Sequence, residues 1–336
     1  MTDPNTPTST RKRSIPPALV LWFISPIFGE VFSGSTPLNE FISPFMILLL
    51  GALYGGGAIL IRELLVRWRK GWPSLLLLGM AYGIYEEGLV VRSFFDPNWQ
   101  DLDNLGVYGR VLGVNWVWTE HLTIFHAVVS IAASIVFVEM LYPGRRAQSW
   151  VGKRGLVLNA LGFVITLPLV GLLNPYNAPD VWLGVCWLVI TLLVYAAWRA
   201  PAAIERRSPA AVPRPRRFFF TAFLATIVYH FLIYIPAEQG SPHFVITLFL
   251  VVLLLLIILW LVLRWSNGAR DWDDCHRFAL LCGPLVFFLI LGLLIHSQNN
   301  LVFYFSSPIF LVLLWWAYRR VDQRVKGESA SLLDAP

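Results

Sequence analysis

Two adjacent glutamates interrupt an apolar stretch of the sequence, and their presence there needs a chemical explanation. Glu86 and Glu87 stand in YEEGLVVRSFFDPNW (residues 85–99), directly after the apolar run from Trp72 to Ile84. A charge at the centre of a membrane helix costs about 2.5–3.5 kcal/mol on insertion scales. Partners must offset that cost, and a carboxyl pair held by such partners can keep one member ionised as a general base.

A histidine in the following apolar run is the expected partner of this pair. Glu86 and Glu87 lie about nine residues, or ~13 Å, from the outer end of their run, and His126 lies about ten residues, or ~15 Å, into the next. Because the two runs are antiparallel, acid and imidazole are predicted at matching depth around a polar cavity that opens outward. Adjacent residues on an α-helix point about 100° apart, so the glutamates are not expected to share one contact.

Further polar residues lie nearer the predicted outer surface and are expected to border this cavity. They are Glu30, Arg92, Glu120, His121, His230, His296, Asn299 and Asn300. Structural interpretations stay open for the histidines and acids: bonds to a neighbouring helix or to backbone carbonyls, and for His230 a ring cluster with Tyr229 and Tyr234. On the inner side, Arg62 is expected to reach toward the lipid headgroups.

The composition indicates an integral membrane protein. Of the 336 residues, 57% are hydrophobic and 14% are charged, and the mean hydropathy is +0.64, whereas soluble domains average about 25% charged residues. The net charge of +6 does not indicate nucleic-acid binding, because the basic residues lie between apolar runs. The three cysteines form no CxxC pair, so no disulfide framework is expected.

Ten apolar runs approach the ~20 residues that a bilayer-spanning helix needs. Backbone groups in lipid must bond within their own span, so the predicted fold class is an all-α polytopic bundle of about ten transmembrane helices. The first run is expected to be retained rather than cleaved as a signal peptide. The runs lie near residues 17–34, 42–66, 73–95, 116–141, 155–173, 181–198, 218–236, 244–264, 277–296 and 301–318.

The basic residues predict the orientation of the chain in the membrane. When the connections are assigned alternately to two sides, every lysine and arginine except Arg62, Arg92 and Arg110 falls on the side of the two termini. The positive-inside rule then places both termini in the cytoplasm of a multi-pass plasma-membrane protein. The predicted organisation is a tail (1–16), a six-span half with the polar cavity (17–198), a linker (199–217), a four-span half (218–318) and a tail (319–336).

One stretch of small residues bears on how the helices pack. Gly51, Gly55, Gly56 and Gly57 lie on one predicted span. Small residues let membrane helices approach closely, so this face predicts tight helix packing. A broken helix that lines the cavity is the alternative interpretation.

The spacing of the polar residues resembles that of the CAAX-protease and bacteriocin-processing family of intramembrane proteases. The motifs of that family are EExxxR, FxxxH and HxxxN or HxxxD. Glu86 and Glu87 match the acidic pair, whereas Arg92 comes one residue later than in the family. His126 matches the histidine of the second motif, with Leu122 in the position of its phenylalanine.

The third motif is matched by His296 and Asn300, which lie much further along the chain than in that family. The resemblance implies that Glu86 or Glu87 activates a water that His126 helps to position. It also implies that His296 and Asn300 stabilise the oxyanion of a tetrahedral intermediate. A Glu/His set could bind zinc as well, but there is no HExxH motif, so metal and cofactors stay unassigned.

Three functions remain open from the sequence. The first is an intramembrane hydrolase, protease-like, acting on a membrane-embedded peptide or a small molecule. The second is a transporter or permease in which the glutamates and His126 couple to a proton or a cation. The third is a non-catalytic membrane subunit whose buried charges fix helix assembly.

Overall fold

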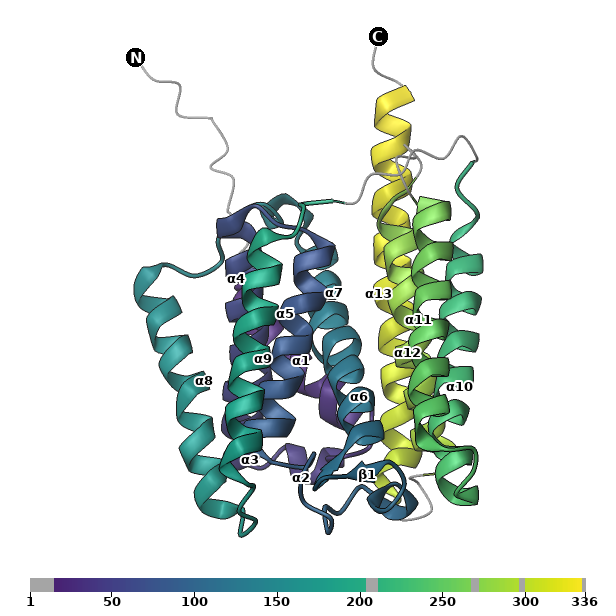
Figure 1. Ribbon diagram of the computed structural model, residues 1–336. Helices are drawn as coiled ribbons and strands as arrows, with labels where there is room; N and C mark the ends of the chain where they lie inside the picture. The colour runs from purple at the N-terminus through teal and green to yellow at the C-terminus, as the bar shows by residue number, and fades with distance from the viewer. Residues whose placement is uncertain (1–14, 204–210, 267–271, 296–299, 334–336) are drawn as a thin grey trace.

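The computed structural model describes residues 15–203, 211–266, 272–295 and 300–333, and the chain forms a helical membrane bundle (Figure 1). Four membrane-crossing helices of the N-terminal half change from α-helix to π-helix along their length. They are α1 (Pro17–Pro26) with η1 (Ile27–Val31); α3 (Pro44–Leu50), η2 (Gly51–Gly55) and α4 (Gly56–Trp68); α5 (Trp72–Ile84) with η3 (Tyr85–Val90); and α6 (Trp116–Phe125), η5 (His126–Ala133) and α7 (Ser134–Leu141).

The other long helices are regular. They are α8 (Lys153–Leu173), α9 (Asp180–Arg199), α10 (Pro215–Gln239), α11 (Phe244–Ser266), α12 (Asp274–Leu294) and α13 (Val302–Leu333). Short elements occupy the connections: α2 (Leu38–Phe41), the 3-10 turns η4 (Asp103–Gly106) and η6 (Pro143–Arg145), and an antiparallel hairpin of β1 (Arg110–Val111) and β2 (Val114–Asn115).

The all-α membrane fold predicted from the sequence is confirmed. Within the described residues, eight helices are long and apolar enough to cross a membrane. The two remaining predicted spans are also helical. Pro17–Val31 is apolar but shorter, and Trp72–Val90 contains the two glutamates that lower its hydropathy.

The helices alternate in direction, so that the first and last described residues lie at the same end of the molecule, the upper end in Figure 1. The lower end holds α2 and the β hairpin. The cytoplasmic location of the termini stays a prediction, because the fold alone does not orient the bundle in a membrane. Exposed apolar side chains cover α8 and α11, and these surfaces suit contact with lipid chains.

Helices α10 to α13 lie beside the N-terminal helices, as Figure 1 shows. Helix α10 packs on α11 and α12, and α12 packs on α13. Across the boundary, α12 contacts α7 and η5, and α11 contacts α6. The predicted linker 199–217 runs between α9 and α10, and its residues 204–210 lie outside the described part.

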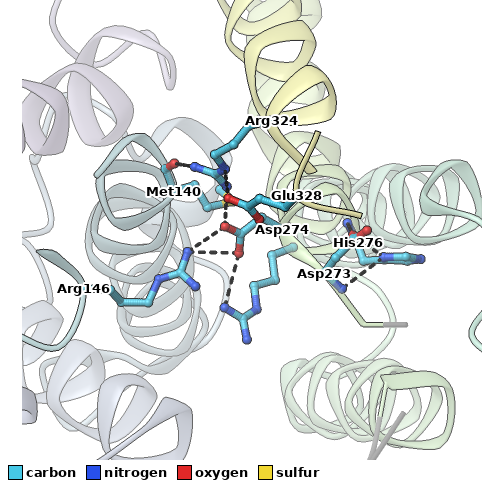
Figure 2. A network of polar contacts seen from close by, with 8 residues as sticks. Met140, Arg146, Asp273, Asp274, His276, Arg324 and Glu328 are labelled. Atoms are coloured by element: carbon cyan, nitrogen blue, oxygen red, sulfur yellow. Dashed lines mark hydrogen bonds and ion pairs between the residues drawn. The ribbon is translucent and has the colours of Figure 1, made fainter. Parts of the chain in front are cut away.

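A group of ion pairs around Asp274 joins the two sets of helices (Figure 2). Asp274, at the start of α12, accepts two hydrogen bonds from Arg146, at 2.8 and 2.9 Å, and one from Arg324 of α13 at 2.5 Å. Arg277 adds a contact of 3.4 Å. Arg324 also donates to the backbone carbonyl of Met140, in α7. Asp274 therefore neutralises arginines that belong to both sets of helices.

A buried arginine fixes the same end of the N-terminal helices. Arg62 is 1% exposed, donates to the carbonyl oxygens of Arg146 and Gln148, and pairs with Glu63 at 3.0 Å. Its guanidinium lies 3.8 Å from the centre of the Trp150 ring. The prediction that Arg62 reaches toward headgroups is therefore wrong. The loop after α7 supplies backbone acceptors for both terminal nitrogens of this side chain inside the protein.

Replacement of Asp274 by asparagine tests the link between the two sets of helices. Asp274→Asn leaves Arg146 and Arg324 without their shared counter-ion. We expect a loss of about 2–3 kcal/mol in the free energy of unfolding in detergent, below the 3–5 kcal/mol of a fully buried pair. Asp322→Asn is the control, because its partner Lys326 is exposed and such i,i+4 pairs contribute about 0.3–0.5 kcal/mol. Equal losses in the two variants would contradict this account.

Candidate functional site

Four π-helical segments meet at one place inside the N-terminal helices. Glu30 lies in η1, Tyr54 in η2, the pair Glu86 and Glu87 in η3, and His126 in η5. A π-helix bonds i to i+5 and is rare, and it occurs frequently at functional sites. Each of these helices thus departs from regular geometry where it carries a polar side chain of the site.

His126 lies between the two glutamates. Its Nε2 is 2.9 Å from Oε1 of Glu87, and its Nδ1 is 3.2 Å from Oε2 of Glu86 and 3.1 Å from the Ser130 hydroxyl. Glu86, Glu87 and His126 are 3%, 7% and 2% exposed. The expectation that the glutamates cannot share one contact is therefore wrong. The imidazole offers a nitrogen on each side, and the π-helical turn presents both carboxyls to it.

The second oxygen of Glu87 is held by the segment that follows η3. The Ser93 hydroxyl donates to Oε2 of Glu87, and it accepts a hydrogen bond of 3.1 Å from the indole N–H of Trp118 in α6. Both oxygens of Glu87 are thus engaged. By contrast, Oε2 of Glu86 is buried and has no hydrogen bond of good geometry among the described residues.

Glu30 brings a third carboxyl to the group. Its Oε2 accepts a hydrogen bond of 2.6 Å from Thr36, and its Oε1 accepts one from the Tyr54 hydroxyl. The Tyr54 ring lies 5.8 Å from the ring of His126. Glu30 is partly exposed, whereas Glu86 and Glu87 are buried.

The charges of this group do not balance by themselves. Three carboxyls surround one imidazole, and no arginine or lysine in the described part of the chain forms an ion pair with any of the three. A protonated imidazole can neutralise one carboxylate. Because uncompensated buried charges are costly, the other two carboxyls require protons or a bound cation.

Glycines let the helices approach closely enough to form this arrangement. A Cβ at Gly79 in α5 would lie 2.8 Å from the Cα of Ala127 in η5, and one at Gly83 would lie 3.1 Å from the Cβ of His126. In η2, Cβ atoms at Gly51 and Gly55 would meet Trp22 of α1 at 2.2 and 2.4 Å. The close packing predicted for the glycine face is therefore present, and it lies in a π-helical turn.

The donor atoms of the cluster suit a metal ion. Glu86, Glu87 and His126 each offer one ligand atom, and these atoms lie within 4.8 Å of one another. Three protein ligands with an open position are typical of catalytic zinc sites, and the unpartnered Oε2 of Glu86 fits a ligand position. When bound, such a metal would polarise a carbonyl oxygen or lower the pKa of a water.

The other predicted site residues lie elsewhere or outside the described residues. Arg92 has φ of 61° and donates to the carbonyl of Tyr176 at 2.7 Å, between α8 and α9. Asn300 lies beside Asn39 of α2, with 3.4 Å between their side-chain amide atoms. His296 is among the residues that the structure does not describe. Neither Arg92 nor Asn300 thus contacts the glutamates or His126.

A second polar group lies between α6 and α10. The hydroxyl of Tyr229 is 2.8 Å from Nδ1 of His121, and His230 stacks on Tyr234 with 4.2 Å between ring centres. Glu120 precedes His121 and is only partly buried. The ring cluster expected around His230 is therefore present, with Tyr234 stacked on its imidazole.

The loop after η3 begins beside the cluster, because the Ser93 hydroxyl and the Phe94 N–H both donate to Glu87. The outward opening of a polar cavity stays a prediction. Phe94, Phe95, Leu102 and Leu105, from the loop after η3, are each buried to 2% exposure or less. Arg110 fixes this loop by donating to three of its backbone carbonyls, those of Phe95, Asp96 and Gly106. Hydropathy shows only that much of the connection 91–115 is polar, so the packing of its apolar residues could not be inferred from it.

Sequence reasoning missed the hydroxyl groups around the cluster. Ser130 follows His126 by four residues, and Tyr82 precedes Glu86 by four, so helical spacing could have placed them on the same face. The Tyr82 ring lies 5.9 Å from the His126 ring, and its hydroxyl has no hydrogen bond of good geometry within the described chain. Tyr54 and Ser93 come from other elements, and no local signal marks them.

Fold and site together define a multi-spanning helical membrane protein with a buried Glu/His cluster. The model of an uncharacterised membrane protein family matches residues 19–325, so the chain belongs to that family. No curated protein and no solved structure gives a significant match.

Substitution of Gly79 tests the close approach on which the cluster depends. The Cβ of Gly79→Ala meets backbone atoms of Ala127 that cannot rotate away. We expect a loss of about 1–3 kcal/mol in the free energy of unfolding, the usual cost of overpacking. Gly162→Ala in α8 is the control, because its Cβ meets nothing within 4 Å. A Gly79→Ala protein as stable as the control would contradict the packing described.

Proposed function

We propose that this protein is an intramembrane hydrolase whose centre is formed by Glu86, Glu87 and His126. The observation that carries the proposal is the imidazole with a carboxyl at each ring nitrogen, at 2.9 and 3.2 Å. A base oriented by a second group is the arrangement that general acid–base catalysis uses. Purely structural packing needs only one such partner, whereas this site holds three carboxyls.

The contacts favour different roles for the two glutamates. Both oxygens of Glu87 are engaged, by His126 and Ser93, so we assign it to orient the imidazole. Glu86 has an oxygen without a good hydrogen bond, so we assign it to take a proton from the attacking water. The water oxygen bonds to the substrate carbonyl carbon, the carbonyl–leaving-group bond breaks, and His126 gives a proton to the leaving group.

The resemblance to the CAAX-protease and bacteriocin-processing family supports the proposal only in part. The glutamate pair and His126 lie together, whereas Arg92 and Asn300 contact other residues. We therefore propose the buried Tyr82 hydroxyl as the oxyanion donor, because its ring lies 5.9 Å from that of His126 and its hydroxyl lacks a good partner. This arrangement favours a protease-like reaction in the plasma membrane, with a membrane-embedded peptide as the substrate. A small molecule is the alternative substrate.

Isosteric variants test the hydrolase. In proteoliposomes with fluorogenic single-span peptides as probes, we expect Glu86→Gln, Glu87→Gln and His126→Gln to lower kcat by about 10²–10⁴-fold, the usual contribution of general acid–base groups. Tyr82→Phe should lower kcat by about 10²–10³-fold, as loss of an oxyanion donor does. Glu120→Gln, in the same helix as His126 but outside the cluster, is the control and should retain activity.

Two results would contradict the hydrolase. One is full cleavage by folded Glu86→Gln and Glu87→Gln proteins. The other is the absence of peptide cleavage in a wild-type protein that moves ions across the same vesicles.

Proton or cation transport is the second candidate, and the unbalanced charge of the site favours it. Glu30, Glu86 and Glu87 together exceed the single positive charge that His126 can supply, which is a composition suited to a bound cation. In a proton-coupled carrier, Glu87→Gln should spare substrate exchange and abolish uptake driven by a pH gradient. Substrate exchange and uptake driven by a pH gradient are measured in the same vesicles. A carrier shows substrate exchange in the wild type, whereas a hydrolase does not.

A further inference from the structure

A basic pocket lies between α10 and α11, at the opposite end of the bundle from the Glu/His cluster. Its volume is about 350 Å³, and its lining residues are Ala211, Pro213, Arg217, Leu261, Arg264 and Trp265. Arg217 lies near the first turn of α10 and Arg264 near the last turn of α11. Both arginines therefore line the same pocket, near the ends of two adjacent helices.

The two arginines of this pocket have no acidic partner among the described residues. Arg217 lies over the ring of Trp265 with its Cζ 4.5 Å from the ring centre, and Arg264 lies over Trp260 at 5.2 Å. Arg146 and Arg324 at the same end are instead neutralised by Asp274. The pocket therefore keeps two positive charges available to a ligand.

Aromatic packing fixes the walls of the pocket. Phe218 meets the rings of Trp265, Trp272 and His276 edge-on, with ring centres 5.4, 4.9 and 5.5 Å apart. His276 lies 3.0 Å from the carbonyl oxygen of Pro213, which holds the segment before α10 in place. Packed aromatic rings thus hold Trp265 and the segment before α10 in place, and the exposed Arg217 and Arg264 lie against this frame.

We propose that this pocket binds a phosphate group through Arg217 and Arg264, and that an anionic phospholipid supplies it. Guanidinium groups bind phosphate oxygens in pairs, and basic pockets between membrane helices bind anionic headgroups. Leu256 and Ile257, about two turns before Arg264 on α11, are exposed, so the acyl chains of the same lipid can lie along that helix. The inference does not depend on the hydrolase proposal.

Binding to the purified full-length protein in a neutral detergent tests this site. Phosphatidylglycerol, phosphatidylcholine and inorganic pyrophosphate are titrated separately, and bound lipid is counted by native mass spectrometry. We expect phosphatidylglycerol to bind and phosphatidylcholine to bind at least ten-fold more weakly. Arg217→Gln/Arg264→Gln should lower the affinity for phosphatidylglycerol at least ten-fold, and Arg217→Lys/Arg264→Lys should retain part of it.

Arg319→Gln/Arg320→Gln is the matched control. These two arginines, on α13, also stack on tryptophans, Trp315 and Trp316, but line no part of this pocket. The control should bind phosphatidylglycerol as the wild type does. Equal loss in the two double variants, or no loss in Arg217→Gln/Arg264→Gln, would overturn the site. Binding of pyrophosphate without phosphatidylglycerol would keep a phosphate site and overturn the lipid as its source.

Discussion

The structure depends on one constraint: carboxyl and imidazole groups placed inside a bilayer must find their partners within the protein. Glu86 and Glu87 meet it in part by contacting His126, and Ser93 and Ser130 add further hydrogen bonds. An unsatisfied polar group in hydrocarbon costs several kcal/mol. Four helices therefore have to converge at the same depth, and they do so through π-helical turns and glycine contacts that regular apolar helices would not need.

The two ends of the bundle carry different kinds of polar groups. The Glu/His cluster lies toward the lower end, beneath a folded loop, and the upper end is fixed by Asp274 and the buried Arg62. At the upper end, Asp274 and Glu63 each pair with more than one arginine. The lower cluster has an excess of acids, and this imbalance is the physical reason to assign it a function rather than a packing role.

The sequence was sufficient for the features that depend on composition and on the length of the spans. Hydropathy located the helices, and the rise per residue placed Glu86 and Glu87 at the depth of His126. Features that depend on contacts between distant segments could not be predicted. The π-helical turns have no marker in the sequence, because their geometry follows from packing between helices.

Two residues show why motif spacing alone was insufficient. Arg92 follows the glutamates closely in sequence, but its positive φ directs it to the carbonyl of Tyr176. Asn300 fits a short motif, but it lies beside Asn39 of α2. The prediction that Arg62 reaches toward headgroups was wrong for a related reason. Its hydrogen-bond acceptors are backbone carbonyls of a loop more than 80 residues away in sequence.

The contact between Glu87 and His126 is the centre of this account, and a double-mutant cycle measures it most directly. The free energies of unfolding of wild type, Glu87→Gln, His126→Gln and the double variant are compared in the same detergent. For groups in contact we predict a coupling energy of about 1–3 kcal/mol. Additive effects, within about 0.5 kcal/mol, would show that the two side chains do not meet, and would contradict the site described.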